Sequence, residues 1–138
     1  HVNKEKAWND IEKILKQVGM DKSCLKKYPH ELSGGQLQRI AIARALIIQP
    51  KLLICDEITS SLDQVIQREI IELLKQFVDK YHTAILFISH DLSLVHKFCD
   101  QILVLNDGRI LEKGTIQQLY KSKNEVVQDL LSAAYLNG

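Results

Sequence analysis

The stretch LLICDE, residues 52–57, decides the fold of this chain. Its first four residues are all apolar, and Asp56 and Glu57 follow them directly. A short run that is apolar throughout is typical of a strand buried on both faces of a parallel sheet. Ligands of open α/β sheets bind beyond the carboxyl ends of the strands. The two carboxylates therefore mark a candidate site at the end of a predicted strand.

Adjacent carboxylates at a strand end offer two kinds of chemistry. Asp56 is suited to hold Mg²⁺, usually through water molecules, because Mg²⁺ keeps much of its hydration shell in proteins. Glu57 is placed to polarise an attacking water molecule. The alternative is a solvated strand end whose acidic groups only cap the next element. Both interpretations stay open on this stretch alone.

A second apolar run, residues 84–88, again ends in polar residues that include His90. Residues 66–78 lie between the two runs and carry apolar side chains at helical spacing, with Asp63 as a candidate N-cap. A strand–helix–strand order implies a right-handed crossover and a parallel pair. A neutral His90 imidazole can donate a hydrogen bond to a phosphoryl group. The alternative is an ordinary surface histidine.

The remaining segments are expected to be helical, apart from one hairpin. Helical spacing of apolar residues predicts a helix over residues 7–18, closed by Gly19, and a connector over 20–31. A second helix starts near Ser33 and is stopped by Pro50. Further along the chain, the sequence predicts a β-hairpin over 102–111 with Asp107-Gly108 at its turn, a capping box formed by Thr115 and Gln118, and a short helix over 124–134.

Leu32-Ser33-Gly34-Gly35-Gln36 stands where the second helix begins. Glycines allow a ligand to approach the backbone closely, and the first N–H groups of a helix have no partner within it. With the helix dipole, this arrangement makes an anion site. The alternative is a capped turn with Ser33 as N-cap, and this segment taken alone favours the capped turn.

The composition is that of a globular protein. Of 138 residues, 46% are hydrophobic and 25% charged, and the formal net charge of +1 gives no support for a polyanionic partner. The three cysteines, Cys24, Cys55 and Cys99, form no C-x-x-C pair, which favours a reducing compartment. No apolar stretch reaches the length of about 20 residues that a bilayer span needs. The chain begins at His1, so we expect its true N-terminus to lie upstream.

Four ordered segments resemble the motifs of ABC-type ATPases. They are the signature motif at residues 32–36 with its continuation over 38–46, the Walker B strand at 52–57, the D-loop at Ser61-Leu62-Asp63, and the switch histidine at His90. The resemblance extends from about Tyr28 to Gly114. It implies an α/β fold: a partial P-loop NTPase-like ABC ATPase domain, consisting of the helical subdomain, the C-terminal part of the parallel-sheet core and a β-hairpin.

The resemblance also implies roles for these residues. Glu57 would be the general base and His90 would contact the γ-phosphate of ATP, while Asp56 would help to coordinate Mg²⁺. The loop Ser33, Gly34, Gly35 and Gln36 would bind ATP held by a second ATPase subunit, packed head to tail with this one. The D-loop residues Ser61, Leu62 and Asp63 would lie at that dimer interface.

Two positions depart from the family pattern, and one motif is missing. Ile58 stands where the family typically has proline, and Ser61 where it often has alanine. No G-x-x-x-x-G-K-[ST] loop, the Walker A motif that cradles phosphates, is found in the sequence, and the Q-loop glutamine is not identifiable. Residues 19–23 contain a Lys-Ser pair, but Asp21 stands where glycine is needed. We therefore expect a truncated chain with little or no activity by itself.

The resemblance divides the chain into three parts: a helical signature subdomain over 1–50, the C-terminal part of the catalytic core over 51–114, and a helical tail over 115–138. The segments Tyr28-Pro29-His30-Glu31, 100–115 and 127–133 are similar to importers of oligopeptides and nickel. That branch implies transmembrane permease partners, no nucleic acid, and a cytoplasmic position on the inner face of the cell membrane. The alternatives are a soluble ABC-type ATPase outside transport and a non-catalytic remnant.

Overall fold

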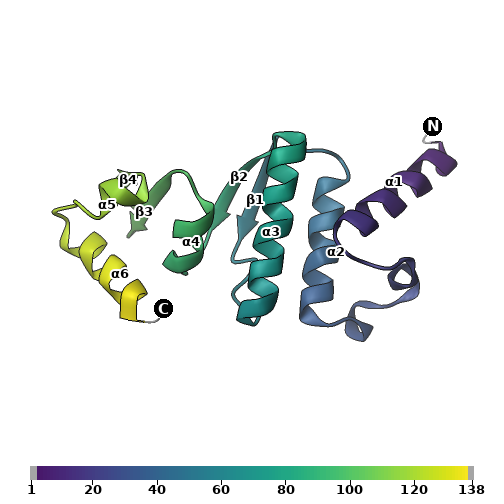
Figure 1. The fold of residues 1–138 in the computed structure, drawn as a ribbon, viewed down its shortest axis with the longest axis horizontal. Helices are drawn as coiled ribbons and strands as arrows, with labels where there is room; N and C mark the ends of the chain where they lie inside the picture. The colour runs from purple at the N-terminus through teal and green to yellow at the C-terminus, as the bar shows by residue number, and fades with distance from the viewer. Residues whose placement is uncertain (1–2, 137–138) are drawn as a thin grey trace. The chain divides into compact units, whose positions relative to one another are not determined.

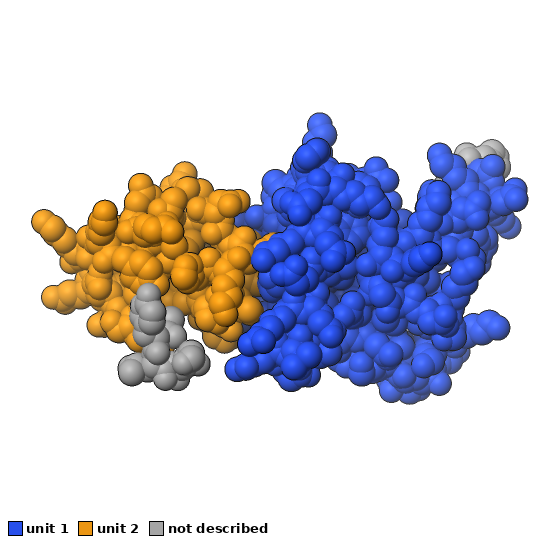
Figure 2. Space-filling model, viewed as in Figure 1, with its two compact units in different colours: residues 1–86 blue, residues 87–138 orange. Residues whose placement is uncertain are grey.

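The computed structural model describes residues 3–136, which divide after Leu86 into two compact units (Figure 2). The element order is α1 (Lys4–Gln17), η1 (Lys22–Lys26), η2 (Pro29–Glu31), α2 (Gly34–Leu46), β1 (Leu52–Asp56), α3 (Gln64–Tyr81), β2 (Ala84–Ile88), α4 (Leu92–Phe98), β3 (Ile102–Asn106), β4 (Arg109–Gly114), α5 (Ile116–Leu119) and α6 (Glu125–Leu136) (Figure 1). Among these residues, no helix combines the length and apolar character that crossing a membrane requires.

α1 begins at Lys4, three residues before the predicted start, and it ends ahead of Gly19 as the sequence predicts. The Asn3 side chain accepts hydrogen bonds from the backbone N–H groups of Glu5 and Lys6, which have no partner within the helix. Gly19 follows the helix with φ of +69°, the left-handed conformation that glycine adopts without a steric penalty. The buried face of α1 is formed by Ile14 and Leu15.

The predicted connector over 20–31 is more regular than expected, because it contains the two short 3₁₀ helices η1 and η2. Each is held by a local acidic side chain. The Asp21 carboxylate accepts from the Ser23 N–H at 2.8 Å, and the Glu31 carboxylate accepts from the Tyr28 N–H at 2.6 Å. Such local side-chain bonds give a turn an alternative to a longer helix.

α2 and α3 lie side by side in the first unit (Figure 1). α2 ends four residues before Pro50, in agreement with the prediction that the helix stops ahead of it. The predicted N-cap of α3 is confirmed, because the Asp63 side chain accepts from two backbone N–H groups of the first turn. Ile70 and Leu74 on α3 are fully buried, and with Phe77 they form the apolar stripe that the sequence indicates.

β1 and β2 are neighbours in a two-stranded sheet. The N–H of Ala84, the first residue of β2, donates to the carbonyl of Lys51, which precedes β1, at 2.9 Å. Both strands thus start at the same edge, as the predicted parallel pair requires. The Thr83 hydroxyl reinforces this edge by donating to the Pro50 carbonyl at 3.0 Å.

The prediction that these strands are buried on both faces is wrong. In β1, Leu53 and Cys55 are buried, but Leu52 and Ile54 are 55% and 60% exposed. In β2, Leu86 is 44% exposed. Side chains alternate between the two faces of a strand, so one face of this sheet is covered and the other is open in the described chain. The apolar run therefore predicts more burial than residues 3–136 provide.

The predicted hairpin is confirmed in the second unit. β3 pairs antiparallel with β4, from Ile102 opposite Gly114 to Asn106 opposite Arg109, with a β-bulge between Val104 and Leu105. Asp107 and Gly108 form the turn with φ of 48° and 73°. Two consecutive positive φ values are those of a tight hairpin turn whose twist matches the flanking strands.

Helices complete the second unit. The predicted capping box opens α5, since the side chains of Thr115 and Gln118 each accept a backbone hydrogen bond from the other residue. α6 agrees with the predicted tail helix; residues 137 and 138 of that tail lie outside the described residues. The core of this unit is made of residues from α4, the hairpin, α5 and α6: Val95, Ile102, Val104, Ile116, Leu119, Val127 and Leu131.

One helix, α4, was not predicted. Its start signal is present in the sequence: the Asp91 carboxylate accepts from the N–H groups of Ser93 and Leu94 at 2.9 and 3.2 Å. In the sequence, Asp91 is one of the polar residues that follow the preceding strand. Since the helix has seven residues, it shows too few turns for its apolar spacing to stand out.

Candidate functional site

The two predicted acidic residues stand at the carboxyl end of β1. Asp56 is the last residue of the strand and Glu57 is the next, and both are exposed. Glu57 has φ of 49°, a left-handed conformation that is uncommon for a residue with a side chain. Strained backbone of this kind persists only where the surroundings hold it, and it is frequent at functional sites.

Hydrogen bonds hold the loop that leaves Glu57. Its carbonyl accepts from the Ser60 N–H at 3.2 Å and from the Ser60 hydroxyl at 2.9 Å. The carbonyl of the buried residue Thr59 accepts from the Leu62 N–H at 3.1 Å and from the Gln67 side-chain amide at 3.0 Å. Four bonds to two carbonyls fix the path of the chain from Glu57 to α3. The loop is therefore braced although Ile58 replaces the proline that the family pattern has there.

The predicted D-loop residues form the end of this braced loop. Ser61 is exposed, Leu62 is half-buried, and Asp63 caps α3 by accepting from the N–H groups of Val65 at 3.0 Å and Ile66 at 3.1 Å. Asp63 thus has a structural task that is complete within this chain. A cap of this kind stabilises a helix by about 1 kcal/mol.

The predicted glycine loop forms a capped helix start. The Gln36 N–H donates to the Ser33 hydroxyl at 3.3 Å, and the Ser33 N–H donates to the Gln36 side-chain oxygen at 3.1 Å, which together make a capping box. The capped turn and the anion site are compatible. The box satisfies two donors, while the N–H groups of Gly34 and Gly35 belong to the first turn, where no carbonyl of the helix reaches them.

Two of the predicted motifs meet within the first unit. Gly34 lies next to Leu62, so that a methyl group on Gly34 would be 3.6 Å from the Leu62 Cδ2 atom. Gly35 lies still closer to Ile66 in the first turn of α3. The signature loop and the D-loop therefore pack against each other in the same chain, which the sequence alone did not indicate.

His90 belongs to the second unit, whereas residues 33–36 and 56–63 belong to the first. His90 is exposed and stands between Ser89 and Asp91. The Asp91 N–H donates to the Ser89 hydroxyl at 3.1 Å, and Asp91 caps α4. The imidazole is thus attached to a turn that is fixed on both sides.

The acidic residues fit a partial Mg²⁺ site by the chemistry of their donors. Carboxylate oxygens are the ligands that Mg²⁺ prefers, and in nucleotide sites one or two carboxylates act together with phosphate oxygens and water. Asp56 at the exposed end of β1 offers such oxygens. Within residues 3–136, no group of three or more His, Cys, Asp or Glu side chains is arranged to hold a metal ion.

Burial sets the chemistry of the cysteine beside the acidic pair. Cys55 is 2% exposed, and its desolvation raises the pKa of the thiol to about 11 from an ordinary value of 9.0. The thiol stays protonated at neutral pH and acts as a small apolar side chain, as its position in the apolar run predicts.

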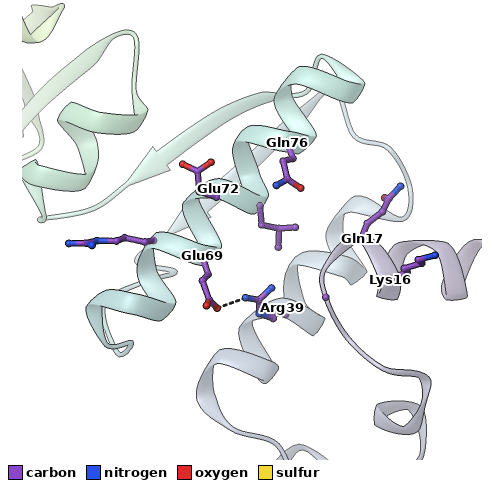
Figure 3. Close-up of a pocket in the computed structure, with 9 residues that line it drawn as sticks. Lys16, Gln17, Arg39, Glu69, Glu72 and Gln76 are labelled. Atoms are coloured by element: carbon purple, nitrogen blue, oxygen red, sulfur yellow. Dashed lines mark hydrogen bonds and ion pairs between the residues drawn. The ribbon is translucent and has the colours of Figure 1, made fainter.

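A pocket of about 390 Å³ lies between the end of α1, α2 and α3 (Figure 3). None of the predicted site residues lines it. Its walls carry mixed charges, from Lys16, Arg39, Arg68, Glu69 and Glu72. Arg39 lines the pocket and makes two hydrogen bonds: one terminal nitrogen donates to Glu69 at 2.6 Å, and the other donates to the Val18 carbonyl at 2.9 Å.

Sequence patterns did not identify the residues that support the site. Ser60 and Gln67 brace the Glu57 loop, and Arg39 and Ile66 hold α2 against α3. Only the Ser60 bond is local enough to be suggested by a sequence pattern, since serine favours turns. The other contacts join residues from different elements, and spacing along the chain does not report them.

These features define an α/β protein in which a strand ends in two carboxylates, and the loop that follows them packs against a glycine-rich helix start. A family model described as "ABC transporter" matches residues 1–60. The oligopeptide transport ATP-binding protein OppF of Mycoplasma genitalium is 44% identical over 114 residues, covering 83% of this chain and 13% of that protein. The nickel import ATP-binding protein NikE of Escherichia coli K12 is 52% identical over 103 residues, covering 75% of this chain and 38% of that protein.

A solved structure agrees with these matches. The dimeric structure of MJ0796, a bacterial ABC transporter cassette, matches with a TM-score of 0.73 and 28% identity, covering 84% of this chain and 50% of that chain. A second structure of MJ0796 shows a post-hydrolysis state bound to ADP and Pi. The chain belongs to the ABC transporter family, and the predicted fold class is confirmed. It spans 13% of the length of OppF and 38% of the length of NikE.

Proposed function

We propose that the protein carrying this chain is an ATP-hydrolysing subunit that energises an ABC-type membrane importer. The observation that carries the proposal is the braced end of β1. Exposed Asp56 and Glu57 stand on a loop that hydrogen bonds fix and that packs, through Leu62, against the capped glycine turn at Gly34. The acidic groups suit the hydrolysis of a phosphate anhydride on one nucleotide. The helix N-terminus, held in the same frame, suits charge stabilisation on the nucleotide of a second subunit.

Each residue has a role in this proposal. Glu57 accepts a proton from the attacking water, and His90 donates a hydrogen bond to the γ-phosphate. Asp56 helps to hold Mg²⁺, which when bound supplies positive charge against the phosphate oxygens. The backbone N–H groups of the Ser33–Gln36 turn face ATP held by a second ATPase subunit and stabilise negative charge there.

The identities of 44% to OppF and 52% to NikE support peptides or nickel as the transported solute. The partners in the proposal are a second ATPase subunit, which meets Ser61, Leu62 and Asp63, and transmembrane permease subunits. The protein is then located in the cytoplasm, on the inner face of the membrane. The three-part division at residues 50 and 114 remains a prediction.

The test compares the full-length protein with its Glu57→Gln variant in single-turnover ATP hydrolysis. Loss of the base is expected to lower the rate by about 10²–10⁴-fold, while binding of a fluorescent ATP analogue is retained. Glu72→Gln is the matched control, because Glu72 is exposed on α3 and pairs only with Lys75 at 3.3 Å among the ion pairs of the described residues. Hydrolysis retained by Glu57→Gln, or lost equally in Glu72→Gln, would remove Glu57 from the role of base.

The solute is tested separately, by uptake of labelled nickel or labelled oligopeptide into cells that carry either the unmodified protein or Glu57→Gln. The proposal expects uptake of one of the two, and expects it to depend on Glu57. If ATP is hydrolysed but neither solute is taken up, the importer assignment is wrong while the ATPase assignment stands.

A further inference from the structure

The two adjacent glycines of the α2 start have different surroundings. A methyl group on Gly34 would lie 3.6 Å from its nearest neighbour, the Leu62 Cδ2 atom, which is an ordinary contact. A methyl group on Gly35 would lie 2.9 Å from the Ile66 Cγ2 atom. That separation is shorter than two carbon atoms tolerate. Gly34 therefore has room for a methyl group in this chain, whereas Gly35 does not.

Ile66 has little freedom to move away from Gly35. Its Cγ2 methyl is bonded to Cβ, so it moves only by rotation about χ1, and a β-branched residue in a helix has one strongly preferred χ1 rotamer. The Ile66 backbone is fixed as well, because its N–H donates to the Asp63 carboxylate at 3.1 Å. The methyl group is thus a rigid surface against which the start of α2 is seated.

A second contact holds the same two helices one turn further on. Arg39 lies four residues after Gly35, and Glu69 lies three residues after Ile66, so both pairs join the same faces of α2 and α3. The Arg39–Glu69 ion pair is 2.6 Å long. With two points of contact along their seam, α2 cannot slide or tilt against α3 without breaking one of them.

We propose that Ile66 is a positioning residue for the turn Ser33–Gln36 at the start of α2. Its Cγ2 methyl sets the distance between the start of α2 and the first turn of α3, and so fixes where the N–H groups of the Ser33–Gln36 turn point. Gly35 must be glycine because it packs on Ile66, whereas Gly34 leaves the backbone open to a ligand. This inference rests on the proposed ATP hydrolysis for its functional consequence.

The test is a rescue experiment in the full-length protein. Gly35→Ala is expected to lower kcat by on the order of 10²-fold, since a displacement of about 1 Å is enough for such a loss, with a smaller change in KM. Ile66→Ala alone removes the positioning contact and is expected to lower kcat, but less than Gly35→Ala does, because it forces no clash. The double variant lacks the Cγ2 atom and is expected to recover from the level of Gly35→Ala to within about threefold of Ile66→Ala alone, because the added methyl then has space. Ile66→Val keeps the Cγ2 atom and is the matched control, which should not rescue Gly35→Ala.

Two readouts separate positioning from folding. The rates are measured at a temperature where circular dichroism shows every variant to be folded. The midpoints of thermal unfolding give a second cycle, in which Gly35→Ala should destabilise the protein less in the Ile66→Ala background than in the unmodified one. The inference is overturned if Gly35→Ala leaves kcat unchanged, if Ile66→Ala gives no recovery, or if Ile66→Val rescues equally well.

Failure of the proposed function has a different signature. If the full-length protein does not hydrolyse ATP, or if Glu57→Gln hydrolyses it at the unmodified rate, the ATPase assignment fails. The unfolding cycle still decides whether Ile66 and Gly35 are coupled. If Glu57→Gln abolishes hydrolysis but the rescue fails, only the role of Ile66 is wrong.

Discussion

Arg39 on α2 and Glu69 on α3 form an ion pair with 2.6 Å between the guanidinium nitrogen and the carboxylate oxygen. The other terminal nitrogen of Arg39 donates to the Val18 carbonyl at the end of α1. The planar guanidinium presents two donors in a fixed fork, so a single side chain joins three helices of the first unit.

The first prediction concerns this joint. Arg39→Met is expected to destabilise the protein by about 1–3 kcal/mol, because it leaves the Val18 carbonyl, on a fully buried residue, without its side-chain partner. Arg39→Lys should restore little, since one ammonium group does not reproduce the two-pronged fork. Urea denaturation followed by circular dichroism measures the difference.

Glu69→Gln is the control for the charge. The Glu69 side chain is 49% exposed, so solvent screens the pair, and its loss should cost only about 0.2–1 kcal/mol. An equal cost for Arg39→Met and Glu69→Gln would show that the ion pair, and not the bond to Val18, dominates.

Local signals in the sequence predicted most of the elements. Caps at Ser33, Asp63 and Thr115, and the turn at Asp107-Gly108, all occur as expected, since each depends on residues two or three positions apart. Burial was less predictable. The run at 52–55 indicates a strand enclosed on two sides, but whether a face is covered depends on elements far away in the chain.

The candidate site was predictable only in part, for the same reason. The identities of Asp56, Glu57 and the glycine turn follow from motif order. Their support does not, because the contacts between Gly35 and Ile66 and between Gln67 and Thr59 join different elements. A sequence shows which groups carry chemistry, whereas packing shows what holds them in position.

The second prediction separates two tasks of Asp63. Asp63→Ala removes the cap of α3 and should cost about 1 kcal/mol of stability, whereas Asp63→Asn keeps an oxygen that accepts the same bonds from Val65 and Ile66. If Asp63 also acts at a subunit interface through its charge, Asp63→Asn should lower ATP hydrolysis while the unfolding midpoint changes little. Equal stability of the Ala and Asn variants would contradict the capping role.

The third prediction follows from the raised pKa of Cys55. Burial favours the neutral thiol, so its contribution to stability is fully present below pH 9.0 and is lost as the pH rises toward about 11. The unmodified protein should therefore lose stability relative to Cys55→Ala over that range. The difference between their urea midpoints, measured at several pH values, gives the result. If the stability of the unmodified protein relative to Cys55→Ala instead increased with pH, the result would contradict the raised pKa.

The same pKa predicts slow chemical modification. Alkylating reagents react with the thiolate, and a pKa two units above the ordinary value lowers the thiolate fraction by about 100-fold at neutral pH. Mass spectrometry after iodoacetamide treatment should show Cys55 modified only when urea is present. Rapid labelling of Cys55 in the folded protein would contradict its burial.

The last prediction concerns the open face of the β1–β2 sheet. Leu52 and Ile54 are 55% and 60% exposed there, and adjacent apolar side chains on a sheet face favour association. The 138-residue chain studied by itself is expected to self-associate. Replacing both residues with threonine keeps the strand propensity and should weaken association by about tenfold or more, since burying one such side chain contributes about 1.5–3 kcal/mol.

Sedimentation velocity over a wide concentration range measures this association. Ile48→Thr is the control, because Ile48 is 78% exposed but belongs to the segment between α2 and β1 and not to either strand. It should leave the association constant unchanged. Mass action makes the unfolding midpoint of an associating protein depend on its concentration. If the chain stays monomeric and unfolds cooperatively, with a midpoint independent of concentration, the open face needs no cover.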